Sequence, residues 1–136
     1  MYTGSNYQRN LPLTEIAKLI KGKLKQDFPQ CKFSVISQYY SMGASLHISL
    51  MSSPFKVGEK DYMQLNQYQF KDKSNIEFIN NGYKITPQLF YIMEKVCTIA
   101  YSYNFDDSDI QTDYFNTNFY LHIYVGQWDK PYKQIN

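Results

Sequence analysis

The sequence CKFSVISQYYSMGASLHISLM, residues 31–51, carries the strongest structural signal in the chain. On both sides of a turn around residues 41–43, apolar side chains alternate with mostly polar ones. Successive side chains of a strand point to opposite faces, so such alternation is typical of a strand with one buried face. The pattern predicts a β-hairpin whose buried set is Phe33, Val35, Leu46, Ile48 and Leu50.

Two segments outside the hairpin show helical spacing instead. Before the hairpin, Thr14 is the predicted N-cap and Pro29 the stop, and the apolar positions are Ile16, Leu19, Ile20, Leu24 and Phe28. A second helix is predicted to begin at Thr86-Pro87, a cap followed by proline at the first helical position. Its apolar stripe is Leu89, Ile92, Met93, Val96, Ile99, Ala100 and Tyr103.

Alternation returns at residues 62–70 and 118–126, which predicts a third and a final strand, and Asn81-Gly82 suggests a short hairpin. The order is therefore α-β-β-β-α-β. Each helix has a single apolar stripe, so both can cover the same face of one sheet. We expect an α+β fold of two layers, with an antiparallel sheet of about four strands and two helices on one face. Residues 1–136 form a single domain, with residues 1–12 as a loose lead-in.

Composition narrows the class of protein. No apolar run approaches the roughly 20 residues of a membrane span, and the first residues lack the pattern of a signal peptide. We therefore expect a soluble, intracellular protein. Cys31 and Cys97 are far apart and lack a C-x-x-C spacing, so two free thiols are expected rather than a disulfide or a zinc site.

The sheet face turned away from the helices is a candidate binding surface. Its predicted residues are mostly polar and aromatic, and those singled out are His47, Tyr68, Tyr120, His122 and Tyr124. Exposed tyrosines can stack on bases or anchor a protein interface. They also simply suit a half-exposed strand, and a sheet with such a face can pair with a second copy to form a homodimer.

A second candidate is the acidic stretch that contains Asp106, Asp107, Asp109 and Asp113. An EF-hand loop starting at Asp107 would need glycine at the sixth position and an acid at the twelfth, where Thr112 and Asn118 stand. The match is poor. The preferred interpretation is a connection that caps its own turn and presents an acidic patch to a partner.

Catalytic and metal-binding patterns find little support. The two histidines, His47 and His122, are predicted on the same face and could approach each other, but no recognised metal or nucleophile motif surrounds them. An enzyme built on this pair remains the third hypothesis. We predict no catalytic residue, metal or cofactor. A lysine cluster on the first helix, Lys18, Lys21 and Lys25, is usually just a solvated face, but it is kept as a candidate for nucleic-acid binding.

Residues 13–51 resemble the large polyvalent protein-associated domains of phages, plasmids and conjugative elements. The resemblance lies in the helix ending "LK..FP", the segment "KFSV", a turn of small residues and the strand "SLHISL". Residues 103–132 are similar to the ends of stand-alone forms. The resemblance implies a protein that accompanies mobile DNA and helps it against host defences, and it implies no catalytic residues.

These observations predict a non-enzymatic accessory protein of a phage or mobile element. Its expected partner is a host defence protein, so that it acts in counter-defence of the anti-CRISPR or antirestriction type. The alternative is a nucleic-acid-binding module that uses the tyrosine-bearing sheet face and the lysine helix. That alternative predicts salt-dependent binding to single strands.

Overall fold

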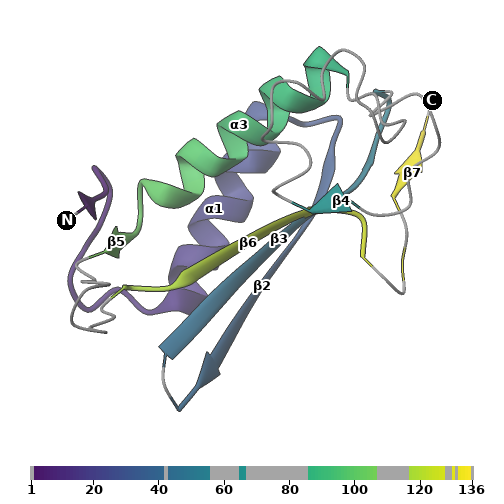
Figure 1. Ribbon diagram of the computed structural model, residues 1–136. Coiled ribbons are helices and arrows are strands. Elements are labelled where there is room, and N and C mark those ends of the chain that lie inside the picture. Colours follow the sequence, from purple (N-terminus) through teal and green to yellow (C-terminus); the bar gives the residue numbers. More distant parts are fainter. Residues whose placement is uncertain are drawn as a thin grey trace, which may run out of the picture.

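The computed structural model describes residues 2–41, 43–55, 65–66, 86–106, 117–127, 130 and 132–135. Its elements are β1 (Tyr2–Thr3), α1 (Leu13–Asp27), β2 (Lys32–Tyr40), β3 (Gly43–Ser53), β4 (Leu65–Asn66), α3 (Pro87–Tyr101), β5 (Phe105–Asp106), β6 (Tyr120–Val125) and β7 (Lys133–Gln134). Figure 1 shows α1 and α3 on the same side of the main sheet, which runs in the order β2-β3-β6-β4. The predicted α+β class, its two layers and its element order are confirmed.

The strand directions in the main sheet are mixed. The pairs β2–β3 and β4–β6 are antiparallel, as predicted, whereas the neighbouring strands β3 and β6 run parallel. A parallel pair needs a crossover connection, and α3 lies between these two strands in sequence and covers the sheet. The short strand β7 then returns beside the end of β3, again in parallel.

The core lies between this sheet and the two helices. All three long strands contribute alternate residues to it, as the sequence predicted, and the two helices contribute their apolar stripes. The fully buried large side chains are Ile16, Ile20, Leu24, Leu46, Ile48, Leu50, Leu89, Met93 and Phe119. At about 25 cal/mol for each Å² of apolar surface removed from water, this core is the main source of stability.

The predicted boundaries of the first helix need correction. α1 begins at Leu13 with Pro12 as the N-cap, and Thr14 is not the cap. The backbone N–H of Leu13 is instead bonded to the hydroxyl of Tyr39 on β2, at 2.8 Å, so a tertiary contact replaces a local cap. Leu19 is 46% exposed. The buried stripe runs through Leu13, Ile16, Ala17, Ile20 and Leu24.

The predicted start of the second helix is confirmed, whereas the predicted apolar stripe ran too far, because α3 ends at Tyr101 and Tyr103 lies beyond it. α3 starts with Pro87 after the N-cap Thr86, whose side-chain oxygen accepts a hydrogen bond from the N–H of Leu89 at 3.2 Å. Its buried residues include Cys97, as expected for an apolar face. Neither Cys31, which is half-buried, nor Cys97 forms a disulfide, as predicted. Neither α1 nor α3 combines the length and apolar character that would let it span a membrane.

The start of the chain was predicted to be a loose lead-in, but backbone hydrogen bonds fix its first residues to the segment after α3. β1 pairs with β5, and the N–H groups of Gly4 and Asn6 donate to the carbonyls of Asn104 and Ser102, at 2.8 and 2.7 Å. A Cβ atom at Gly4 would collide with the carbonyl of Ser102, so glycine lets the two backbones approach.

Two further predictions lie partly or wholly outside the described residues. Of the third strand predicted at residues 62–70, the structure describes Leu65 and Asn66, which pair with β6. The hairpin predicted around Asn81-Gly82 falls in the range that the structure does not describe.

Candidate binding face of the sheet

The face of the main sheet opposite the helices consists of rows of side chains that run across β2, β3 and β6. Strand register places Ile36, His47 and His122 in one row, with a row on each side of it. The described residues of this face are Ser34, Ile36, Gln38, Tyr40, Ser45, His47, Ser49, Met51, Tyr120, His122 and Tyr124. Among these positions there is no Lys, Arg, Asp or Glu.

Three of the predicted residues form a stack of rings. The ring centroids of His47 and His122 lie 4.8 Å apart, with 13° between the ring planes. Tyr124 continues the stack at 6.2 Å from His47, with its ring nearly parallel. The structure therefore brings together the two histidines and one tyrosine that the sequence placed on one face, because their strands are neighbours in matching register.

His47 is held in an environment that favours its neutral form. Its Nε2 lies 3.0 Å from the hydroxyl oxygen of Ser45, which is buried. Burial lowers the pKa of His47, and the neighbouring charge of protonated His122 lowers that pKa further. A lowered pKa keeps the His47 side chain uncharged at neutral pH.

The ring stack does not have the geometry of a metal site. A metal ion must lie near the plane of each imidazole that binds it, about 2.0–2.1 Å from the nitrogen. The nearly parallel planes of His47 and His122 do not meet at such a point. Within the described residues there is also no group of three or more His, Cys, Asp or Glu side chains that could hold a metal ion.

The face is covered unevenly. Ser45 and Ser49 are buried and His47, His122 and Tyr124 are half-buried, whereas Tyr40 and Tyr120 are 45% and 40% exposed. Gly43 lies between these two tyrosines, since a Cβ atom there would be 3.6 Å from the Tyr40 ring and 3.5 Å from the Tyr120 ring. Together with Ile36, which is 51% exposed, they form the open end of the face.

The predicted lysine cluster lies on the other layer, on α1. Lys18 and Lys25 are exposed, and Lys18 pairs with Glu15 of the same helix at 3.5 Å. Lys21 is also exposed and borders a hollow at the end of the sheet where β2 begins, which Ser34 and Met51 of this face also line. The structure therefore does not bring these lysines onto the tyrosine-bearing face, and Tyr68 lies outside the described residues.

The acidic candidates also fall mostly outside the described residues. The backbone of Asp106 belongs to β5 and pairs with Tyr2, and Asp107, Asp109 and Asp113 are not described. The two ends of this segment are described, and they are joined. The carbonyl of Phe105 accepts hydrogen bonds from the Thr117 hydroxyl at 2.9 Å and from the N–H of Asn118 at 3.0 Å.

Asn104 is the residue of this region that the sequence analysis missed. Its buried side chain accepts hydrogen bonds from the N–H groups of Phe105 and Phe119, at 2.9 and 3.2 Å, and donates to the carbonyl of Phe119 at 3.0 Å. One amide therefore satisfies three backbone groups and sets where β6 begins. A single asparagine among many carries no signal in the sequence, because its bonds to Phe119 span fifteen residues.

The comparisons with known proteins identify the family. The model of large polyvalent protein associated domain 29 matches residues 11–114, which is more than half of the chain. The chain belongs to this family. Membership in the large polyvalent protein associated domain 29 family associates the protein with phages and mobile genetic elements. The match covers α1, the β2–β3 hairpin and α3, and it ends before β6.

Neither the curated proteins nor the solved structures contain a significant match to the chain. The function of this member of the large polyvalent protein associated domain 29 family is therefore inferred from its own residues.

Proposed function

We propose that this protein is a non-enzymatic accessory protein of a phage or mobile genetic element that binds a host protein. Its activity would be counter-defence of the anti-CRISPR or antirestriction type, exerted in the cytoplasm of the bacterial host. The observation that carries the proposal is the open end of the sheet face, where the exposed Tyr40 and Tyr120 lie on either side of Gly43 and Ile36 is exposed further along β2, among uncharged described positions.

The chemistry of this face favours a protein over a nucleic acid. The cores of protein interfaces are depleted in charged residues and enriched in tyrosine, and a few such side chains carry most of the binding energy. A nucleic acid instead requires cations opposite its phosphates. The described positions at the open end of the face offer tyrosine, isoleucine and uncharged hydrogen-bonding groups such as Gln38, and no cation.

The edge of the sheet supports the same kind of partner. β2 spans nine residues and pairs with β3 on one side, and no other described strand pairs with its outer edge. An extended segment of another protein can add to such an edge through backbone hydrogen bonds. Because Ile36 and Tyr40 project from this same strand, one partner can engage the edge and the open end together.

The acidic patch remains a second proposed contact. Asp106, Asp107, Asp109 and Asp113 would meet basic residues of the same partner, with an effect mainly on the association rate. Since the side chains of these aspartates are not described, the main test is placed on the sheet face.

The test starts with capture of partners from a nuclease-treated lysate of a bacterial host. A captured protein is identified, purified and titrated against the wild-type chain and against the double variant Tyr40→Ser, Tyr120→Ser. If each tyrosine contributes more than about 1 kcal/mol to the binding free energy, the affinity of this variant should be roughly thirtyfold weaker. The matched control is Leu19→Ser, Tyr91→Ser, which removes two exposed apolar side chains from the helices and should change affinity less than about twofold.

Three results would contradict the proposal. The captured protein could bind the double variant as tightly as the wild type. The only recovered material could be sensitive to nuclease, which would favour the nucleic-acid alternative. Light scattering after size exclusion could show a wild-type dimer that the double variant loses, which would assign the face to a second copy of this chain.

A further inference from the structure

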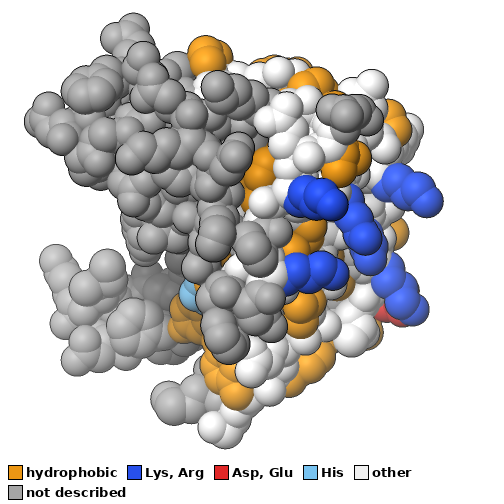
Figure 2. Space-filling view, turned by 90° about the vertical axis from the view of Figure 1, so that its right-hand side faces the viewer, with side chains coloured by type: hydrophobic (Ala, Val, Ile, Leu, Met, Phe, Trp, Pro, Cys, Tyr) orange, Lys and Arg blue, Asp and Glu red, His pale blue; other side chains and the backbone are white. Residues whose placement is uncertain are grey.

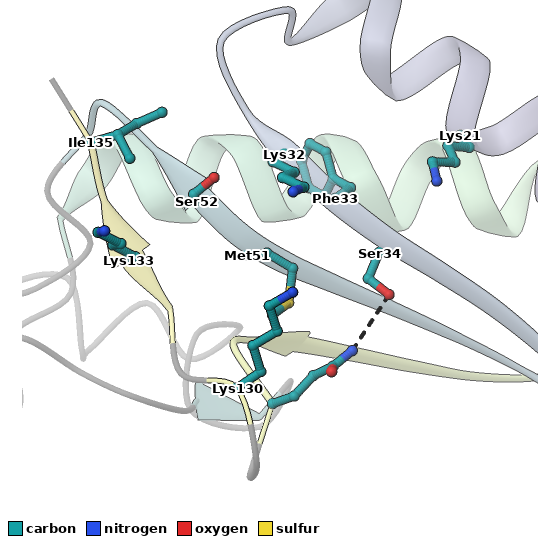
Figure 3. Close-up of a pocket in the computed structure, with 10 residues that line it drawn as sticks. Lys21, Lys32, Phe33, Ser34, Met51, Ser52, Lys130, Lys133 and Ile135 are labelled. Atoms are coloured by element: carbon teal, nitrogen blue, oxygen red, sulfur yellow. Dashed lines mark hydrogen bonds between the residues drawn. The ribbon is translucent and has the colours of Figure 1, made fainter.

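Four lysines from four separate segments surround one hollow at the end of the sheet where β2 begins and β3 ends. They are Lys21, Lys32, Lys130 and Lys133, and Figure 3 shows them around the hollow together with its other lining residues. The hollow has a volume of ≈ 550 Å³, which lies within the usual range for small-molecule sites. Figure 2 shows Lys and Arg side chains gathered around hydrophobic ones on this side of the molecule.

The backbone holds these segments in place. Lys32 and Lys133 flank Ser52 of β3 on its two sides, because each is a register partner of that residue. The turn that carries Lys130 is closed by two backbone hydrogen bonds between Gln127 and Lys130, at 2.9 and 3.1 Å. Further along, the hydroxyl groups of Tyr132 and Ser53 lie 2.6 Å apart.

The positive charge of this hollow is not balanced by the lining residues. No Asp or Glu is among the lining residues that the structure describes. On α1, Lys18 and Lys23 pair with Glu15 and Asp27, at 3.5 and 3.4 Å, whereas Lys21 makes no ion pair with any described residue. Several exposed ammonium groups that face one cavity repel each other, and an anion with more than one charge removes that repulsion.

The remaining lining residues suit a ligand that is only partly charged. Phe33, Met51 and Ile135 supply an apolar wall. The side chains of Ser34, Ser52 and Gln127 supply hydrogen-bonding groups, and the amide of Gln127 donates to the Ser34 hydroxyl at 3.4 Å, which closes one side of the hollow. This combination matches a ligand with a phosphate chain at one end and a flat, hydrogen-bonding, largely apolar group at the other.

We propose that this hollow binds the phosphates and base of a nucleotide, either free or as a unit of a single-stranded nucleic acid. Lysine ammonium groups act as point charges for phosphate. The hollow is separate from the two tyrosines of the open end, since Lys32 and Tyr40, at opposite ends of β2, are roughly 26 Å apart at 3.3 Å per residue. It therefore goes beyond the protein-binding role and does not depend on it.

The experiment uses the full chain and two fluorescent probes, an adenosine triphosphate analogue and a single-stranded DNA of about twelve nucleotides. Binding is followed by anisotropy at about 50 and about 200 mM salt. The hollow variant Lys32→Gln, Lys133→Gln is compared with the control variant Lys18→Gln, Lys25→Gln, which removes the same charge from α1. The four substituted lysines are all exposed, so neither double change should disturb the fold. Equal melting temperatures of the two variants check this.

The expected result is saturable binding that the hollow variant weakens at least about tenfold and the control less than about twofold. For the DNA probe, the plot of log affinity against log salt has a negative slope. This slope should become shallower by about 1.4 in the hollow variant, at about 0.7 for each lost phosphate contact. If unlabelled nucleotide displaces the DNA, a free nucleotide suffices as ligand. If it does not, the ligand is the strand.

Three outcomes would overturn the proposal. Neither probe could bind saturably at the lower salt. The control variant could lose as much affinity as the hollow variant, which would show diffuse attraction to the whole surface. Inorganic tripolyphosphate or an acidic peptide such as polyglutamate could displace the probes as well as the nucleotide does, which would mean that the apolar wall recognises nothing.

Discussion

The imidazole rings of His47 and His122 stack at 4.8 Å because the two residues are register partners on the parallel strands β3 and β6. The pKa of His47 lies below its usual value of 6.5 mainly because burial opposes its protonation, and the neighbouring charge of His122 lowers it further. Stacking of this kind links the stability of the sheet face to pH.

We expect the fold to lose stability on acidification. Because the pKa of His47 is lowered in the folded state, the unfolded chain takes up the proton first as the pH falls. The stabilisation is therefore complete above about pH 6.5 and is lost as the pH falls below that value and through the lowered folded-state pKa. Melting temperatures measured from pH 8 to about pH 5 should fall more for the wild type than for His47→Gln. Parallel curves for the two proteins would contradict this assignment.

Asn104→Ala should be strongly destabilising. The change removes three hydrogen bonds inside the fold and leaves the N–H groups of Phe105 and Phe119 without this acceptor, while the Phe119 carbonyl keeps its bond from the Thr117 hydroxyl. A loss of about 2–3 kcal/mol in the free energy of unfolding is expected from urea titration. Asn6→Ala is the control, because Asn6 is exposed and bonds only the Ser102 hydroxyl through its side chain, so it should cost less than about 0.5 kcal/mol.

The corrected register of α1 predicts opposite results for adjacent residues. Ile20 is fully buried and Leu19 is largely exposed. Ile20→Ala should cost about 2–4 kcal/mol in urea unfolding, whereas Leu19→Ala should stay within about 0.5 kcal/mol. Similar losses of stability for both changes would show that Leu19 is buried like Ile20, which would contradict this register.

The N-cap of α3 can be tested in the same assay. Thr86→Ala removes the acceptor for the N–H of Leu89 and should cost about 1 kcal/mol, while Thr86→Ser should retain most of that stability. Thr98→Ala serves as the control, because the Thr98 hydroxyl is exposed and donates only to the Glu94 carbonyl of its own helix. An equal cost for Thr86→Ala and Thr98→Ala would argue that the cap contributes nothing.

Local patterns in the sequence determined much of the fold. Alternation assigned Phe33, Leu46 and Leu121 to the core face, and Tyr120, His122 and Tyr124 to the other. The Thr86-Pro87 pair marked the start of α3. These predictions succeed because side-chain period and capping depend on neighbours within a few residues. The predicted start of α1 was wrong for the opposite reason, since the N–H of Leu13 donates to the Tyr39 hydroxyl, which comes from another element.

Only the tertiary structure decided which residues distant in the sequence become neighbours. Sequence alternation placed His47 and His122 on one face, but the parallel pairing of β3 and β6 made them stack. The same holds for Asn104 and Phe119, and for the four lysines that converge from α1, β2, β7 and the turn before β7. A period of two or of 3.6 residues specifies the face on which a side chain lies. It contains no information about which distant strand pairs with which, because that choice depends on burial and hydrogen bonding across the whole chain.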